Sequence, residues 1–220
     1  KTAYEIACSL VGSEIFIRDS PWTLAAYSIE GRSSKDFEKT LGFLESNQKD
    51  VHDLLIKYTD ACFLYLRKQV QSGADVIQIF DSWANLLTKE DLIEFSFNYI
   101  NSLISALKLD PITKNIPVII FARNPKCNIE ELINTSADCI SLFWSMNDLN
   151  FEVAKNKVAI QGNLDPKILL ESDETIKRET YKILERFKEY PGYIFNLGHG
   201  ITPDISPDKI KYLTNIVREY

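Results

Sequence analysis

One stretch near the end of the chain reads Tyr193-Ile-Phe-Asn-Leu-Gly-His-Gly-Ile-Thr-Pro-Asp204. Its first three residues, 193–195, are apolar and predict a short buried strand. The glycines on both sides of His199 predict a sharp turn that leaves the imidazole uncovered. A histidine between a strand and a helix lies where α/β enzymes hold catalytic groups, although a loop histidine can also simply cap neighbouring backbone. This stretch therefore predicts an α/β fold with His199 as a candidate functional residue.

Upstream of this stretch, short apolar runs alternate with segments of helical spacing. Strands are expected at 13–18, 74–80, 117–121, 138–142, 158–161 and 193–196, and helices from Pro21 and at 36–45, 49–71, 88–109, 129–134, 147–155, 173–188 and 207–219. About six strand–helix units with apolar strands indicate a parallel sheet buried on both faces. A doubly wound sheet can hold six strands, whereas a (β/α)8 TIM barrel needs eight. In a barrel, the helix-like start at Lys1 places the two absent units on the N-terminal side.

The composition fits one domain covering residues 1–220, with 45% hydrophobic and 25% charged residues. The net charge of −6 argues against a nucleic-acid partner, and no apolar run has the length of a membrane span. The four cysteines form no CxxC pair, which predicts no structural metal site and a reducing, cytoplasmic location. No signal-peptide pattern is present. The missing initial methionine suggests a fragment.

The residues after each strand are the candidates for chemistry. Ser82, His199 and Asp81 could form a hydrolase triad, but the segment Phe80–Trp83 lacks the GxSxG elbow. Metal-dependent hydrolysis lacks a convincing ligand set, because the chain has only two histidines. The tryptophans after the strands are expected to pack, and Asp165 before Pro166 is expected to cap a helix. These residues alone indicate an α/β barrel enzyme with a polar mouth.

Four segments, taken together, resemble the uroporphyrinogen decarboxylase family in order and spacing. They are Ser20-Pro-Trp-Thr-Leu-Ala-Ala-Tyr-Ser-Ile-Glu-Gly31, Ile79-Phe-Asp-Ser-Trp-Ala84, Ala159-Ile-Gln-Gly-Asn-Leu-Asp-Pro166 and Phe195-Asn-Leu-Gly-His-Gly-Ile201. The resemblance covers the whole chain. It implies a (β/α)8 barrel, usually a homodimer, that removes four acetate carboxyls from uroporphyrinogen III to give coproporphyrinogen III. The family works in heme and porphyrin biosynthesis without a metal or organic cofactor.

The resemblance also implies roles for individual residues. Tyr27, Ser82 and His199 match the family's substrate-contacting and catalytic residues, and Phe80 matches part of its apolar pocket wall. Tyrosine, serine and histidine offer neutral or switchable donors for carboxylates.

The chain departs from the family at its N-terminal side. The family's arginine pair and its central aspartate, which binds pyrrole N–H groups, are expected to lie before Lys1. Positive charge within this chain would then come from Arg18, Arg32 or Arg123.

Three other interpretations of the chain remain open. The chain could be a catalytically inactive fragment, or a barrel that serves as a binding protein. It could also belong to the related cobamide-dependent methyltransferases, which use zinc bound by cysteine and histidine. The methyltransferase interpretation requires a cysteine near His199, and the segment Gly198–Ile201 has none.

Overall fold

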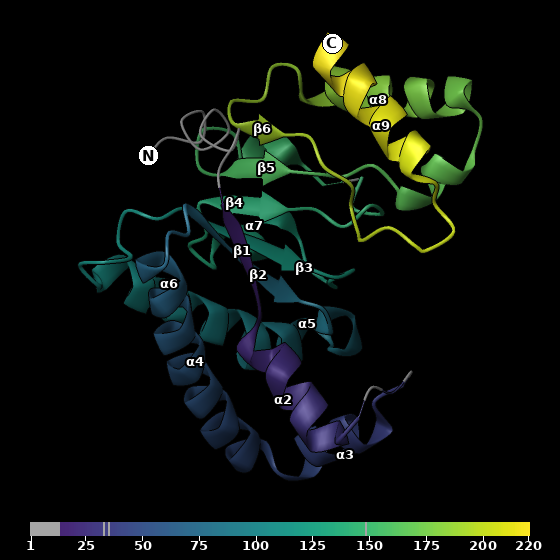
Figure 1. Ribbon diagram of the computed structural model, residues 1–220. Coiled ribbons are helices and arrows are strands. Elements are labelled where there is room, and N and C mark those ends of the chain that lie inside the picture. Colours follow the sequence, from purple (N-terminus) through teal and green to yellow (C-terminus); the bar gives the residue numbers. More distant parts are fainter. Residues whose placement is uncertain (1–13, 33, 35, 148) are drawn as a thin grey trace.

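The computed structural model describes residues 14–32, 34, 36–147 and 149–220. Within these residues six strands form one sheet in the order β1 to β6, and all neighbouring pairs are parallel (Figure 1). The strands are β1 (Ile15–Asp19), β2 (Val76–Asp81), β3 (Val118–Ala122), β4 (Cys139–Ser141), β5 (Ala159–Gln161) and β6 (Tyr193–Ile194). The consecutive parallel order confirms the predicted α/β sheet, a partial barrel of six units. Three features of the sequence analysis lie outside the described residues: the helix-like start at Lys1, the cysteine Cys8 and the first strand residue Ser13.

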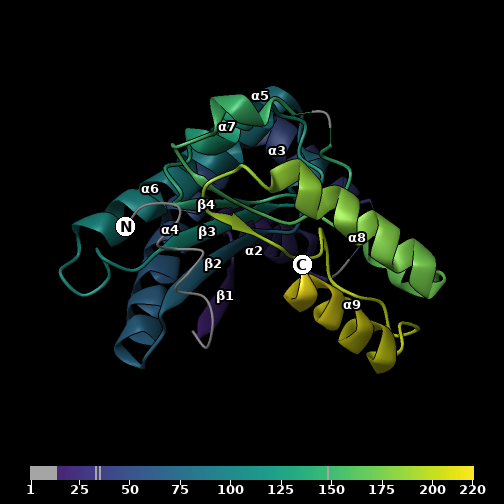
Figure 2. The same ribbon diagram turned by 90° about the horizontal axis from the view of Figure 1, so that it is seen from above.

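Helices connect the strands and flank the sheet. They are α2 (Pro21–Glu30), α3 (Glu38–Ser46), α4 (Gln48–Gln71), α5 (Lys89–Asp91), α6 (Asn98–Leu109), α7 (Ile129–Ile133), α8 (Asp173–Phe187) and α9 (Pro207–Glu219). A π-helical segment, η2 (Leu92–Phe97), joins α5 to α6. In Figure 2, α4 and α6 lie on one side of the molecule, and α8 and α9 lie on the other. None of the helices in the described residues has the length and hydrophobicity needed to cross a bilayer.

Two local predictions were wrong. The helix expected at 147–155 is only a 3₁₀ turn at Phe151–Val153. Asn150 accepts a hydrogen bond from the backbone N–H of Glu152, and Asn156 has a left-handed φ of 65°, so asparagine side chains and backbone compete with the helix. Residues 193–195 are half-buried and not fully buried, because β6 is an edge strand that pairs only with β5 in the described part of the chain.

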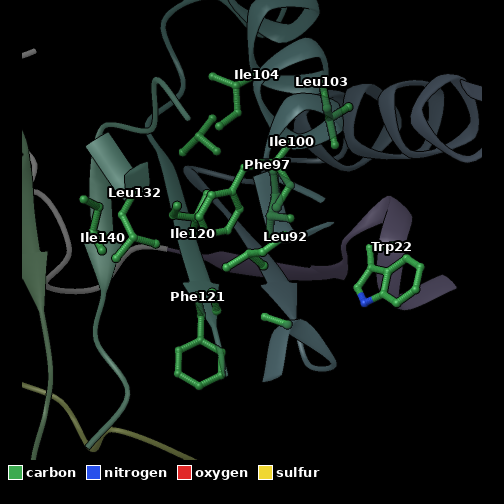
Figure 3. Packing of buried hydrophobic residues seen from close by; sticks show 14 of the residues in the cluster. Trp22, Leu92, Phe97, Ile100, Leu103, Ile104, Ile120, Phe121, Leu132 and Ile140 are labelled. Carbon is green, nitrogen blue, oxygen red and sulfur yellow. The ribbon is translucent and has the colours of Figure 1, made fainter. Parts of the chain in front are cut away.

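One face of the sheet packs against the helices and forms the main core. Ile79, Ile120 and Ile140 belong to the largest apolar cluster, which also contains Phe97 of η2 and Leu132 of α7. Figure 3 shows Ile120 and Ile140 beside Phe97 and Leu132, whereas Phe121 extends away from this group. Alternate residues of a strand point to opposite faces, so Phe121 belongs to the other side of the sheet.

That other face changes character along the strands. At the N-terminal ends of the strands it carries a small apolar cluster that contains Val76, Ile119, Cys139 and Ala159. Toward the C-terminal ends, polar Gln78, Ser141 and Gln161 replace the aliphatic side chains, and Gln161 Nε2 donates to Ser141 Oγ over 3.0 Å. In the described strands, this face is therefore apolar at its N-terminal end and carries polar side chains from Gln78 onward in β2 and at the ends of β4 and β5.

A buried carboxylate fixes the geometry of this edge. Asp81, the last residue of β2, is fully buried. Its Oδ1 accepts hydrogen bonds from the hydroxyls of Ser20 and Thr23 over 3.2 Å each, and its Oδ2 accepts one from Ser96. Ser20 is the N-cap of α2, and Ser96 belongs to η2. One side chain therefore joins the β1–α2 corner, the end of β2 and the π-helical segment.

Burial raises the pKa of Asp81 to about 6, although hydrogen bonds from Ser96, Ser20 and Thr23 oppose this effect. The folded state then holds the proton more tightly than the unfolded state, so stability should fall as the pH rises from about 4 to about 6. The difference between the ordinary pKa of 3.8 and the pKa of about 6 in the folded protein corresponds to roughly 3 kcal/mol of unfolding free energy.

We therefore expect wild type to lose roughly 3 kcal/mol of unfolding free energy relative to Asp81→Asn between about pH 4 and about pH 7. Urea denaturation of both proteins across this range measures the difference. Asp60→Asn on the exposed face of α4 is the matched control for the chemical change. A difference between wild type and Asp81→Asn that is independent of pH would show that Asp81 does not titrate in this way.

Candidate active site

A cleft of about 590 Å³ opens at the C-terminal ends of the strands. Its lining comes from strands β1 to β4, from helix α2 and from the loops after β2, β3 and β6: Ile17, Tyr27, Gln78, Phe80, Ser82, Trp83, Phe121, Arg123, Ser141, Asn196, Leu197, His199, Gly200 and Ile201. The four predicted site residues, Tyr27, Phe80, Ser82 and His199, all line it. Segments more than 170 positions apart in the sequence thus meet at one mouth.

Tyr27 reaches the rim of the cleft from α2. Its ring lies edge-on to Trp83, with ring centroids 5.9 Å apart, and 6.0 Å from the ring of Phe37. Tyr27 is 37% exposed and lines the cleft. Since Ser20 caps α2 and binds Asp81, the position of this phenol depends on the buried carboxylate.

Ser82 enters the cleft because it directly follows Asp81. Consecutive side chains at a strand end point to opposite faces, so the carboxylate turns toward the helices and the hydroxyl toward the cleft. The backbone N–H of Ser82 donates to Thr23 Oγ1 over 3.0 Å. Among the described residues no hydrogen bond joins Asp81, Ser82 and His199, so they do not form a hydrolase triad.

His199 stands on an aromatic wall. Its ring lies edge-on to Phe143, with centroids 5.9 Å apart, and 6.2 Å from Phe121, which in turn lies 5.2 Å from Phe80. The imidazole is exposed, as predicted, and its Nδ1 lies 3.4 Å from the carbonyl of Gly200. The sequence did not predict that Phe121 and Phe143 contact His199. Because alternate residues of β3 face the cleft, Phe121 could have been predicted to do so, but the contact between Phe143 and His199 depends on tertiary packing.

The glycines beside His199 act differently from the prediction. Neither has a positive φ, so they do not provide a left-handed turn. A Cβ on Gly198 would lie 2.4 Å from the backbone nitrogen of Trp144, whereas a Cβ on Gly200 would meet open space. Gly198 also donates its N–H to Leu164 over 2.8 Å. The histidine loop is therefore placed by a close backbone approach that only glycine permits.

Within the described part of the chain, Arg123 is the one cleft-lining residue with a permanent charge, and no aspartate or glutamate lines the cleft there. Arg18 lies on the opposite face of β1, where its guanidinium sits 5.0 Å from the ring centroid of Tyr65. Arg32 is exposed beyond the end of α2 and does not line the cleft. An aromatic wall with hydroxyl, imidazole and guanidinium donors suits a ring-shaped ligand with anionic substituents.

In the described part of the chain, no three His, Cys, Asp or Glu side chains are close enough to share a metal ion. The described cysteines, Cys62, Cys127 and Cys139, are unpaired. Burial raises the pKa of each thiol, that of Cys127 to about 12, so these thiols are poor nucleophiles.

Residues 16–220 match the family profile described as uroporphyrinogen decarboxylase (URO-D). The chain belongs to this family. It is 40% identical over 203 residues to uroporphyrinogen decarboxylase of Ruthia magnifica subsp. Calyptogena magnifica, and 40% identical over 201 residues to that of Aquifex aeolicus. Each alignment covers 91% of this chain and 58% of the relative, so the chain spans less than two thirds of the length of these relatives.

A solved structure, described as a methyltransferase from Methanosarcina mazei, has a similar fold. The TM-score is 0.71 with 19% sequence identity, over 93% of this chain and 58% of that structure. At this identity the likeness concerns the fold alone.

Gly198 provides a test of how the histidine loop is placed. Gly198→Ala should lower the unfolding free energy by roughly 1–3 kcal/mol, because the methyl group would collide with backbone atoms of Trp144. Gly200→Ala, on the other side of His199, is the matched control and should cost less than about 0.5 kcal/mol. Chemical denaturation of both variants measures the costs, and equal costs would contradict the close-approach explanation.

Proposed function

We propose that this chain forms the active-site cleft of a uroporphyrinogen decarboxylase, a carboxy-lyase of heme and porphyrin biosynthesis. The substrate would be uroporphyrinogen III, whose four acetate side chains lose CO₂ to give coproporphyrinogen III. The observation that carries the proposal is the meeting of Tyr27, Ser82 and His199 on an aromatic wall in a chain of this family. The proposal involves no metal or organic cofactor.

The reaction needs an electron sink and a firm hold on the substrate. When a pyrrole ring is protonated, the electron pair of the breaking bond between the CH₂ group and the carboxyl carbon can pass into the ring, and CO₂ leaves. A proton then adds to the CH₂ carbon to form a methyl group, and the ring loses its extra proton to restore the neutral pyrrole. The ring protonation and the carboxylate orientation are the steps that protein groups can assist.

The cleft residues fit these tasks in different ways. The hydroxyls of Tyr27 and Ser82 can donate hydrogen bonds to acetate or propionate oxygens. His199 is exposed and, when protonated beside an anionic ligand, can donate from both ring nitrogens. Phe80 and Phe121 offer an apolar surface for a pyrrole ring. We propose that His199 binds and orients a carboxylate and is not the sole proton donor.

The methyltransferase alternative rests on the fold alone, and among the described residues the cleft lining contains no cysteine that could join His199 in a zinc site. We also propose a cytoplasmic location, supported by the unpaired Cys62, Cys127 and Cys139 among the described residues.

The full-length protein should convert uroporphyrinogen III to coproporphyrinogen III, and His199→Asn should slow turnover by about one to two orders of magnitude. This estimate corresponds to the loss of one charge-assisted hydrogen bond. Chromatography of the porphyrins should show partly decarboxylated intermediates, because a looser hold allows early release. Unchanged activity would make His199 structural, and complete loss with intact binding would make it an obligatory acid.

We further propose a homodimer in which two clefts face each other. Tyr27 and Ile201 lie at the rim and are 37% and 52% exposed, which leaves apolar surface for such a contact. Light scattering at micromolar concentration should give twice the mass of the full-length chain, and Ile201→Asp should shift the population toward monomers. A monomeric wild type would contradict the proposal.

A further inference from the structure

Arg123 stands out in the cleft because its guanidinium has no ionic partner in the described residues. Its backbone N–H donates to the carbonyl of Asp81 over 3.0 Å, which fixes the main chain at the end of β3. The side chain is half-buried, and its contact within the described residues is the ring of Trp83, 5.6 Å from guanidinium carbon to centroid. An arginine in this position keeps its N–H donors available for a ligand.

Trp83 is itself held firmly and can support this arginine. Its carbonyl accepts from Trp22 Nε1 over 3.1 Å, and its ring lies 4.3 Å from the ring of Phe37. The same indole ring meets the edge of Tyr27 at 5.9 Å. Trp83 therefore brings the guanidinium of Arg123 and the phenol of Tyr27 to one part of the cleft rim.

The chain around Arg123 is also restrained on its other side. Asn124 adopts a left-handed φ of 43°, and its Oδ1 accepts a hydrogen bond from Ser145 Oγ over 3.2 Å. Lys126, two residues further on, is exposed and does not line the cleft. The loop thus offers two cations close in sequence, of which only one faces the cleft.

We infer that Arg123, supported by Trp83, is a specificity-determining residue that binds one carboxylate of the ligand at the Tyr27 side of the cleft. The inference rests on the proposed function and extends it. A guanidinium without an acidic neighbour gains more from a ligand with many carboxylates than from one with few. Arg123 should therefore favour the octacarboxylate over the tetracarboxylate, so that substrate is held and product is released.

The test compares binding of two stable porphyrins, octacarboxylate uroporphyrin and tetracarboxylate coproporphyrin, to the full-length protein. Isothermal titration calorimetry at low salt should show that Arg123→Gln raises the Kd for uroporphyrin about tenfold, and that for coproporphyrin less. Arg123→Lys keeps the charge without the planar fork and should fall between wild type and Arg123→Gln. Lys126→Gln makes the same charge change outside the cleft and should alter each Kd less than about twofold.

Two further measurements separate binding from general charge effects. Added salt should weaken uroporphyrin binding more in wild type than in Arg123→Gln, because the screened interaction is missing in the variant. In turnover assays, Arg123→Gln should raise KM for uroporphyrinogen III with a smaller effect on kcat.

The outcomes separate the inference from the proposed function. If wild type decarboxylates uroporphyrinogen III and Arg123→Gln binds uroporphyrin as well as wild type, the inference is wrong and the function stands. Uroporphyrin binding that depends on Arg123 without turnover would support the inference and overturn the function. If wild type binds neither porphyrin and does not decarboxylate uroporphyrinogen III, both are wrong. If Lys126→Gln matches Arg123→Gln, the effect is general charge and the inference is wrong.

Discussion

The buried carboxylate of Asp81 is the constraint on which the cleft depends. A carboxylate without access to water must find hydrogen-bond donors within the protein, and here they come from Ser20, Thr23 and Ser96. These donors belong to α2 with its N-cap and to η2, so the segments cannot shift independently of β2. Thr23 also accepts the N–H of Ser82. The position of the hydroxyl in the cleft and the direction of α2 are thus set by one network on the helix side of the sheet.

The donors of the cleft are spread over an aromatic surface, and this arrangement gives them their chemical value. Phe121 and Phe143 pack against one side of His199, Phe80 extends this wall through Phe121, and Trp83 packs against Arg123. Hydrogen bonds to carboxylates are stronger where the surroundings are apolar. Under the proposed function, the aromatic wall would cover a pyrrole ring without competing for its polar substituents, and other residues of the cleft would bind the carboxylates.

The sequence predicted the fold more fully than the details of the site. Strand positions agree within one or two residues, because apolar runs are local signals, and Asp165 caps the 3₁₀ segment Pro166–Leu170 as expected. The π-helical turn at Leu92–Phe97 could not be predicted, because it depends on packing and on the bond from Ser96 to Asp81. Gly198 was predicted to provide a sharp turn, but it is needed because a Cβ at this position would clash with the backbone of Trp144, and such a contact between distant residues cannot be predicted locally. From the sequence, Arg123 and Arg18 were equal candidates for a positive charge in the cleft. The alternation of side chains along β1 places Arg18 on the face of the sheet opposite the cleft.

The middle residues of the strands determine the fold, whereas the residues at the strand ends determine the chemistry of the cleft. The buried isoleucines on the helix-facing side would suit many parallel barrels, and a methyltransferase with 19% identity shares the fold. The residues that distinguish this cleft follow the strands, where side chains are free to vary without loss of the core. At the end of β2 the two roles fall on neighbouring residues, because Asp81 stabilises the β1–α2 corner and Ser82 faces the cleft. A one-residue shift in that strand would exchange the two side chains between the faces, so the register of β2 couples the stability of the fold to the chemistry of the site.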